Sequence, residues 1–265
     1  MDQVRASAGT LRLLDLAGFW LGHFVGPSVE RCLQSLSVLR VLCLSFCREP
    51  DLGIWLQRCP TTQLVYLNLR AASVLQDANL APVLAANPGL RYLNVGYSVL
   101  LSDATLRDVA RHCRSLTSLD VSYAQRMTAQ GLRDVWMSFP HLNEFGFSGF
   151  VGLMDADIVD LVTRLPGLRT IGIGGIPFLT DVALHSIADG CPLLESVYAC
   201  DLHNVTRAGL MTLLRSCTRL HKVFMFRCVR LSPADIGMLK DKYPYVYEGD
   251  MLPDEFVRME NEFLR

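Results

Sequence analysis

The sequence predicts an α/β solenoid in which a strand–helix unit of 26 residues recurs along the chain. Three observations predict it: an apolar triplet with strand spacing recurs regularly, an apolar triplet with helical spacing follows each one, and turn and capping residues separate the two. The chain has 265 residues, of which 51% are hydrophobic and 19% charged. This apolar content offsets the entropy of ordering, so the composition excludes an intrinsically disordered chain.

The first triplet has the form apolar-x-x-apolar-x-apolar, with the short alternation of a strand. All 21 template positions of the seven regular copies are apolar. These copies begin 26 residues apart, at Leu64, Leu90, Leu116, Leu142, Leu168, Leu194 and Leu220. Two earlier copies begin at Leu11 and Leu39, and a degraded copy begins at Val246. We therefore expect about ten repeats over residues 1–250.

The second triplet begins sixteen residues after the first and has the i, i+3, i+4 spacing of one helix face. Leu80, Val83 and Leu84 form it in one repeat, and only Lys240 breaks the pattern in the seven copies. Each repeat is therefore expected to contain a strand, a turn, a helix and a return loop. Because one unit cannot bury its apolar side alone, stacked neighbours should share a continuous core.

The connecting residues support these boundaries. Ser102, Thr128 and Thr180 stand where the helices should begin, and such side chains accept hydrogen bonds from the free amides of the first turn. Pro88 and Pro192 follow the helical triplets, and proline cannot continue a helix. We therefore expect the helices to begin at the Ser or Thr residues and to end before the prolines.

The segments LRVLCLSFC (residues 39–47), LHKVFMFRC (220–228) and LTDVALHSIADGCPLLESV (179–197) resemble the cysteine-containing leucine-rich-repeat family. The resemblance covers about nine tenths of the chain. It implies a horseshoe, with short parallel strands on the concave face and helices on the convex face. Many family members are substrate receptors of ubiquitin ligases with an F-box before the repeats, but only ten residues precede the first triplet here. We therefore expect a relative without an F-box, similar to the antagonist-of-mitotic-exit type.

In horseshoes of this family, the residues between the strand leucines point to the concave face. We expect a partner helix or peptide to bind there, anchored by aromatic side chains. The predicted contact residues are Tyr66, Asn68, Arg70, Tyr92, Asn94, Asp120, Ser122, Glu144, Gly172, Gly174, Tyr198, Lys222, Phe224 and Phe226. Glycine is disfavoured inside strands, so Gly172 and Gly174 suggest that something approaches the backbone closely. The alternative is that these glycines only relieve crowding between repeats.

The C-terminal residues form a second candidate surface. Residues 251–265 are predicted to form an amphipathic helix, in which Phe256, Met259 and Phe263 lie on one apolar stripe. We expect this helix to cap the last repeat, because terminal repeats need a cover for their core. The alternative is that it docks on a partner. The N-terminal end has no comparable pattern, so another protein is expected to cover it.

The cysteines and histidines do not form a site by spacing. Nine cysteines are too few for a disulfide scaffold, and their odd number favours a reducing compartment. Cys43 and Cys47 have no second Cys or His pair nearby at zinc spacing. Cys113, Cys191 and Cys217 share a repeat position that Asn, Phe or Leu fills in other copies, so we expect packing there rather than metal binding. The six histidines occupy unrelated repeat positions.

Other catalytic and nucleic-acid signatures are weak. The sequence has no Gly-x-Ser-x-Gly motif, and residues 172–175 (GIGG) lack the GK[ST] that a phosphate loop requires. The formal net charge is −1, whereas proteins built to neutralise nucleic-acid phosphates are normally basic. We therefore expect no catalytic activity, no cofactor, no metal and no nucleic acid as the main ligand.

The sequence thus predicts a non-catalytic protein–protein interaction module, acting as an adaptor or as a structural subunit of a large assembly. Two alternatives stay open: a substrate-recognition subunit of a ubiquitin ligase without its own F-box, and an RNA-binding module or enzyme. The longest uncharged stretch near the N-terminus apart from one histidine, residues 16–29, has fourteen residues, whereas a membrane-spanning helix needs roughly 20. We expect a cytoplasmic location, with a mitochondrial or ciliary (axonemal) complex as alternatives.

Overall fold

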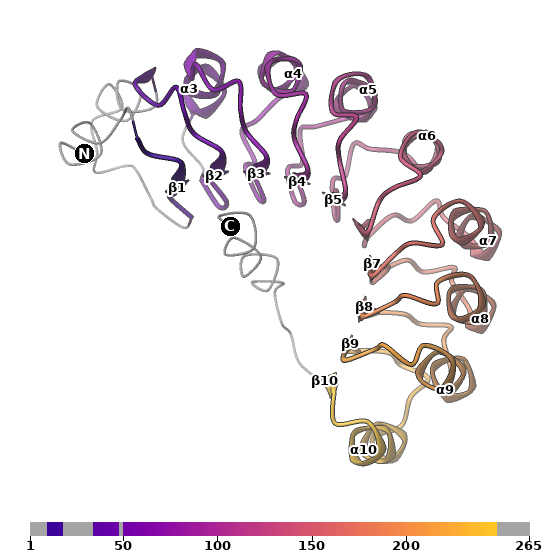
Figure 1. Ribbon diagram of the computed structural model, residues 1–265. Coiled ribbons are helices and arrows are strands. Elements are labelled where there is room, and N and C mark those ends of the chain that lie inside the picture. Colours follow the sequence, from indigo (N-terminus) through magenta and orange to yellow (C-terminus); the bar gives the residue numbers. More distant parts are fainter. Residues whose placement is uncertain (1–9, 18–33, 48–49, 248–265) are drawn as a thin grey trace. The chain divides into compact units, whose positions relative to one another are not determined.

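The computed structural model describes residues 10–17, 34–47 and 50–247. These residues fall into two compact units, and the boundary between the units lies between Gly131 and Leu132 in the sequence. We call the described residues up to 131 unit 1 and those from 132 to 247 unit 2. Each unit has parallel strands on one side and helices on the other (Figure 1). We call the side of each sheet that faces away from its helices the open face.

Unit 1 contains five strands and three helices among the residues described. The strands are β1 (Leu13–Asp15), β2 (Val41–Cys43), β3 (Tyr66–Asn68), β4 (Tyr92–Asn94) and β5 (Ser118–Asp120). The helices are α3 (Leu52–Arg58), α4 (Asp77–Ala86) and α5 (Asp103–His112). Neighbouring strands pair in parallel and in chain order, and their register places Tyr66 beside both Val41 and Tyr92.

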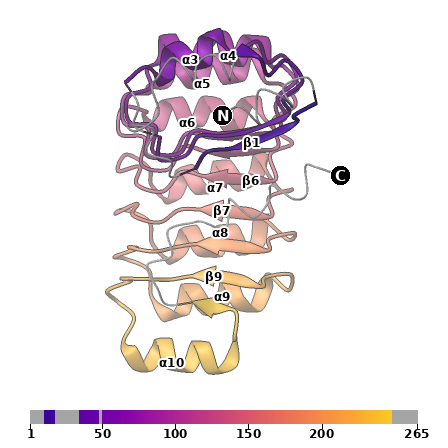
Figure 2. The same ribbon diagram turned by 90° about the vertical axis from the view of Figure 1, so that its left-hand side faces the viewer.

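Unit 2 continues the same alternation. Its strands are β6 (Glu144–Gly146), β7 (Thr170–Gly172), β8 (Ser196–Tyr198), β9 (Lys222–Phe224) and β10 (Val246–Tyr247). Its helices are α7 (Asp155–Arg164), α8 (Asp181–Gly190), α9 (Arg207–Ser216) and α10 (Pro233–Lys242), while α6 (Ala129–Ser138) contains the boundary between the units. In Figure 2 the strands of unit 2 run side by side across the unit, as their parallel pairing requires.

The core lies between the strands and the helices of each unit. All 21 apolar template positions of the seven regular repeats are buried. The helical triplets are buried too, apart from Ala110, Ile236 and Lys240. The predicted α/β repeat architecture is therefore confirmed. None of the helices in the described ranges is long and apolar enough to cross a membrane.

The predicted helix starts are also confirmed. Ser102 accepts a hydrogen bond from the Ala104 amide at 3.2 Å, and Thr180 accepts one from the Val182 amide at 3.2 Å. Thr128 accepts from the Gly131 amide at 3.2 Å. These bonds satisfy amides that lack a partner within the first helical turn.

The same hydroxyls also connect successive repeats. Thr180 donates to the carboxylate of Asp155 at 2.6 Å, and its backbone amide donates to the same carboxylate at 2.9 Å. Asp155 is the first residue of the preceding helix. The same arrangement recurs in pairs of one aspartate and one hydroxyl residue: Asp77 with Ser102, Asp103 with Thr128, and Asp181 with Thr206. We call this series the aspartate ladder; it occurs in both units.

The turn after each strand has a constant backbone conformation. The eighth residue of each described repeat from Leu39 to Leu220 has a positive φ, between 57° and 83°. It is a glycine only at Gly149 and Gly175, and elsewhere it is Phe46, Ala71, Tyr97, Tyr123, Asp201 or Arg227. Left-handed backbone favours glycine, so Gly175 of the GIGG segment has a conformational role in its turn.

The last repeat departs from the prediction. Val246 pairs with Val223, the fourth residue of the preceding repeat, rather than with Leu220, its first residue. The tenth copy therefore begins three residues earlier than the predicted start at Val246. The loop between α10 and β10 is shorter than in the regular repeats, because α10 ends at Lys242 and the strand follows almost directly.

Candidate protein-interaction face

The predicted contact residues lie on the open faces of the two units. Unit 1 carries Tyr66, Asn68, Arg70, Tyr92, Asn94, Asp120 and Ser122. Unit 2 carries Glu144, Gly172, Gly174, Tyr198, Lys222, Phe224 and Phe226. The predicted capping helix, residues 251–265 with Phe256, Met259 and Phe263, lies outside the described residues.

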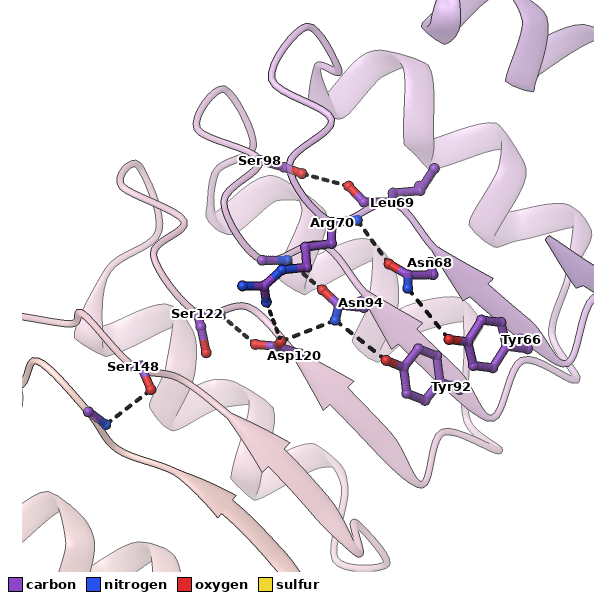
Figure 3. Close-up of polar contacts among 12 residues, drawn as sticks. Tyr66, Asn68, Leu69, Arg70, Tyr92, Asn94, Ser98, Asp120, Ser122 and Ser148 are labelled. Atoms are coloured by element: carbon purple, nitrogen blue, oxygen red, sulfur yellow. Dashed lines mark hydrogen bonds and ion pairs between the residues drawn. The ribbon is translucent and has the colours of Figure 1, made fainter. Parts of the chain in front are cut away.

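A pair of tyrosines forms the apolar part of the face in unit 1. Tyr66 and Tyr92 are register partners, and their rings stack with centroids 4.1 Å apart. Their hydroxyls accept hydrogen bonds from Asn68 at 3.5 Å and Asn94 at 3.4 Å (Figure 3). Burial is the main reason why the pKa of Tyr92 lies well above its ordinary value. Both rings are fully buried although they lie on the side of the sheet away from the helices.

Beside the tyrosines, polar side chains form a continuous network. Asn94 donates to the Asp120 carboxylate at 3.1 Å, and Asp120 accepts from the Ser122 amide at 2.8 Å (Figure 3). Asn68 accepts in the same way from the Arg70 amide at 3.0 Å. Strands β3, β4 and β5 thus each end with a side chain that accepts a hydrogen bond from the amide two residues later. These buried polar groups are satisfied within the sheet.

Arg70 is the exception in this network. Its guanidinium Nη1 lies 3.6 Å from the Asp120 carboxylate, and its side chain is only 5% exposed. The guanidinium carbon lies 4.5 Å from the centre of the Tyr97 ring, which in turn stacks on Tyr123. The Nη1 group has no hydrogen-bond partner. A buried charged donor without an acceptor is costly, so the position is suited to an added acceptor.

The open face of unit 2 carries aromatic residues at one end. Tyr198 stacks on Phe224 with centroids 4.9 Å apart, and Phe224 stacks on Tyr247 at 5.1 Å. Tyr198 and Phe226 are half-buried, while Tyr247 is exposed. These rings offer apolar area together with polar hydroxyl groups, a combination enriched in binding surfaces.

The glycines of unit 2 have an explanation within the chain. A side-chain carbon at Gly174 would lie 2.9 Å from the Cys200 carbonyl oxygen, which real structures do not tolerate. At Gly172 it would lie 3.3 Å from the Cα atom of Gly146. The close approach that these glycines suggested is therefore made by neighbouring repeats. They relieve crowding between repeats, which is the alternative that the sequence left open.

The recurring cysteine position is structural in its geometry. Cys113 and Cys191 are buried, and burial raises the pKa of each thiol to about 12. Asn87 occupies the same position; it accepts from the Leu64 amide at 2.8 Å and donates to the Thr61 carbonyl at 3.0 Å. The side chain at this position, whether a thiol or an amide, therefore forms hydrogen bonds to the neighbouring repeat. Within the part of the chain that the structure describes, no three His, Cys, Asp or Glu residues are grouped so that they could hold a metal ion.

Sequence reasoning missed two features of the face. Tyr97 and Tyr123, which support the Arg70 guanidinium, occupy the eighth position of consecutive repeats. The recurrence of tyrosine at this repeat position could have indicated, from the sequence, that the two rings stack. The burial of Arg70 had no signal in the sequence, because an arginine between strand residues is equally consistent with an exposed side chain.

No protein-family model matches the chain, and no curated protein matches it. Solved structures do resemble it. Rad7, from the yeast Rad7–Elc1 complex, has a TM-score of 0.63 at 17% identity over 85% of this chain and 59% of its own chain. Internalin C2 of Listeria monocytogenes has a TM-score of 0.52 at 16% identity over 83% of each chain.

Human 5T4 (trophoblast glycoprotein) has a TM-score of 0.50 at 17% identity over 79% of this chain and 78% of its own. The chain spans less than two thirds of the Rad7 chain to which it is similar. All three structures are leucine-rich-repeat proteins. At these identities the likeness establishes the fold, and with the 26-residue repeats it identifies the chain as an α/β leucine-rich-repeat solenoid.

Proposed function

We propose that this protein is a non-catalytic protein-interaction module that binds its partner through the open face of unit 2. The observation that carries the proposal is the aromatic row at the end of that face, where Tyr198, Phe226 and Tyr247 have accessible ring area. Leucine-rich-repeat neighbours support a binding role. Aromatic side chains on an otherwise small-residue surface are suitable anchors for a helix or peptide.

The form of the interaction is a finer part of the proposal. Rad7 was solved in complex with Elc1, which supports a stable subunit of an assembly over a transient adaptor. The shared buried position of Cys113, Cys191 and Cys217 supports a relationship to the cysteine-containing, F-box-type repeats. A substrate-recognition role in a ubiquitin ligase is the second version of this proposal. The free thiols of Cys113, Cys191, Cys217 and Cys228 support a reducing, cytoplasmic location.

The proposal is tested by comparing the partners of three tagged proteins from gently lysed source cells. These are the wild type, a Tyr198→Ala/Phe226→Ala variant, and a Val182→Ala control on the exposed side of α8. Quantitative mass spectrometry should find stoichiometric partners with the wild type and the control, and at least tenfold less of them with the double variant. Equal recovery with all three proteins would contradict binding through this face.

A further inference from the structure

The edge at which the strands of unit 1 begin carries exposed arginines. Arg12, Arg40 and Arg91 are each the second residue of a repeat and directly precede β1, β2 and β4. All three side chains are exposed. Backbone hydrogen bonds join this position from one repeat to the next: the Arg40 amide donates to the Arg12 carbonyl at 2.8 Å, and the Arg91 amide donates to the Val65 carbonyl at 2.9 Å. We call these three residues the arginine row.

The arginine row has no counter-charge among the described residues. Within the described ranges, no ion pair and no side-chain hydrogen bond involves these three guanidinium groups. Segments 34–40, 57–65, 85–91 and 111–117 form this edge in the described part of unit 1, and they contain no aspartate or glutamate. Arg12 and Arg40 precede neighbouring strands, whose backbones lie ~4.8 Å apart, so their like charges repel each other.

Unit 2 shows what an arginine at this repeat position binds. The equivalent Arg169 forms an ion pair with Glu195, which is the second residue of the next repeat. Asp189 and Asp241 lie at the same edge of unit 2, between the ends of the helices and the strands that follow. The chain thus supplies carboxylates to this edge in unit 2, whereas the described edge of unit 1 has none.

Two further exposed arginines extend the basic edge of unit 1. Arg111 lies in the last turn of α5, and Arg114 follows its C-cap, Cys113. A cation at the C-terminus of a helix is stabilised by the helix dipole, which gives Arg111 a structural role. The arginine row precedes strands, so the helix dipole does not explain it.

We propose that the arginine row binds an acidic segment of a partner protein, whose carboxylates take the place that Glu195 has beside Arg169 in unit 2. A guanidinium group presents a planar fork of donors that matches a carboxylate. Successive arginines of the row are one and two strand spacings apart, ~5 and ~10 Å. These distances equal the rise of about three and seven residues along a helix, so acidic residues on one helix face can meet the row.

The composition of the edge favours a protein over a nucleic acid. Proteins that bind single-stranded nucleic acids stack the bases on aromatic side chains. Segments 34–40, 57–65, 85–91 and 111–117 contain no phenylalanine, tyrosine or tryptophan. The formal net charge of −1 also disfavours a long chain of phosphates. A few arginines without aromatic neighbours are suited to separate carboxylates.

This surface is distinct from the one proposed for partner binding, because the arginine row belongs to unit 1 and the aromatic row to unit 2. The inference therefore goes beyond the proposed function. A binding measurement with a synthetic acidic peptide tests it without knowledge of any natural partner.

The probe is a fluorescein-labelled decaglutamate peptide, and its binding to the full-length protein is followed by fluorescence anisotropy at low ionic strength. An Arg40→Ala/Arg91→Ala variant should bind it about tenfold more weakly than the wild type, because two charge-assisted contacts are lost. Arg107→Ala/Arg126→Ala is the matched control, since it removes the same charge from exposed residues of unit 1 away from this edge. The control should bind the peptide as the wild type does.

Each other result overturns the proposal. Equal weakening in the variant and the control would show that the peptide responds only to net charge. Absence of binding to the wild type would exclude a site for carboxylates. An oligouridine of equal charge, or phosphatidylserine vesicles, that bound more tightly than the peptide and depended on Arg40 and Arg91 would identify a nucleic acid or a membrane surface as the ligand.

Thermal unfolding checks that the variants keep their fold, as exposed arginines without partners among the described residues should allow. If Arg40→Ala/Arg91→Ala unfolds, cross-linking to the wild type decides. A decaglutamate peptide with a central benzoylphenylalanine should cross-link to residues 34–40 or 85–91, and cross-links only elsewhere would overturn the proposal. This result is independent of the proposed function, because a failed partner experiment on unit 2 leaves it unaffected.

Discussion

The two units share one repeat and fill their open faces differently. Unit 1 covers its strands with a buried network of Tyr, Asn, Asp and Arg side chains, whereas unit 2 has glycine and serine at its centre and half-buried aromatics at one end. The apolar template positions behind the two sheets are the same. The comparison teaches that the template determines the fold, while the positions between template residues are free to specify different surfaces.

The largest difference between the units is expected in the stability that is lost when Asp120 of unit 1 or Ser148 of unit 2 is replaced by alanine. Asp120 holds three partners on the face of unit 1, namely Arg70, Asn94 and the Ser122 amide. In unit 2, Ser148 accepts a hydrogen bond from the Gly174 amide at 3.0 Å. Asp120→Ala should lower the free energy of unfolding by about 3–5 kcal/mol, because a buried guanidinium loses its counter-charge. Ser148→Ala should cost only about 0.5–1.5 kcal/mol.

Urea denaturation of both variants measures this difference. Asp120→Asn is the control, because it keeps the shape of the side chain and removes the charge. Equal costs for Asp120→Ala and Ser148→Ala would mean that the polar network of unit 1 adds no stability beyond single hydrogen bonds.

Substitutions in the core, in contrast, should lower the free energy of unfolding by similar amounts in the two units. Leu119 in unit 1 and Ile171 in unit 2 occupy the same template position, and both are fully buried. Leu119→Ala and Ile171→Ala should each cost about 2–5 kcal/mol, through lost burial and the cavity left behind. Thermal and urea unfolding measure both. A loss below 1 kcal/mol in one unit would show that its core is not packed as the shared template requires.

The sequence predicted the features that depend on local residue spacing, and it did not predict those that depend on contacts between repeats. The triplet around Leu80 predicted a helix because 3.6-residue periodicity is a local property, and α4 lies there. Ser102 was predicted as an N-cap for the same reason. Its bond to Asp77 was not predicted, because that contact depends on how one repeat stacks on the next. The burial of Arg70 involves contacts with Tyr97 and Asp120 from later repeats, and no local pattern encodes those contacts.

Removing a carboxylate charge from the aspartate ladder should cost less stability than a core substitution, and the cost should be similar in both units. Burial alone would raise the pKa of Asp77, but hydrogen bonds from Ser102 and Thr105 outweigh it and lower the pKa below its ordinary value. A lowered pKa in the folded state stabilises the protein at pH values above the ordinary range of the carboxyl group. This contribution is lost as the pH falls through the lowered pKa.

Asp77→Asn should therefore reduce stability by about 1 kcal/mol at neutral pH, through weaker hydrogen bonds. The gap between wild type and variant should close as the pH is lowered below 4. Asp181→Asn makes the matching change in unit 2 and should cost a similar amount at neutral pH. Chemical denaturation at neutral and acidic pH measures both. A gap for Asp77→Asn that stays constant with pH would contradict the role of the carboxylate charge.

The smallest expected change in stability comes from replacing a helical glycine by alanine, and its sign should differ between an interior repeat and the last one. Gly209 in α9 and Gly237 in α10 are both helical glycines of unit 2, so replacing either by alanine gains about 0.5–1 kcal/mol of helix propensity. Gly237 has nothing within 4 Å of the added carbon, and Gly237→Ala should raise stability by that amount. At Gly209 the added carbon would overlap the Asp181 carboxylate, which Thr206 holds in the aspartate ladder.

Gly209→Ala should therefore lower stability in spite of the same gain in propensity. Gly131 meets the Asp103 carboxylate in the same way in unit 1, so Gly131→Ala should behave like Gly209→Ala and unlike Gly237→Ala. Thermal unfolding of the three variants ranks them. If all three were equally stabilising, the ladder carboxylates would be able to move aside at no cost, and the ladder would not fix the stacking of repeats in either unit. A loss confined to Gly131 and Gly209 would mean that the ladder, like the apolar template, is common to both units, and that the units differ in their surface residues.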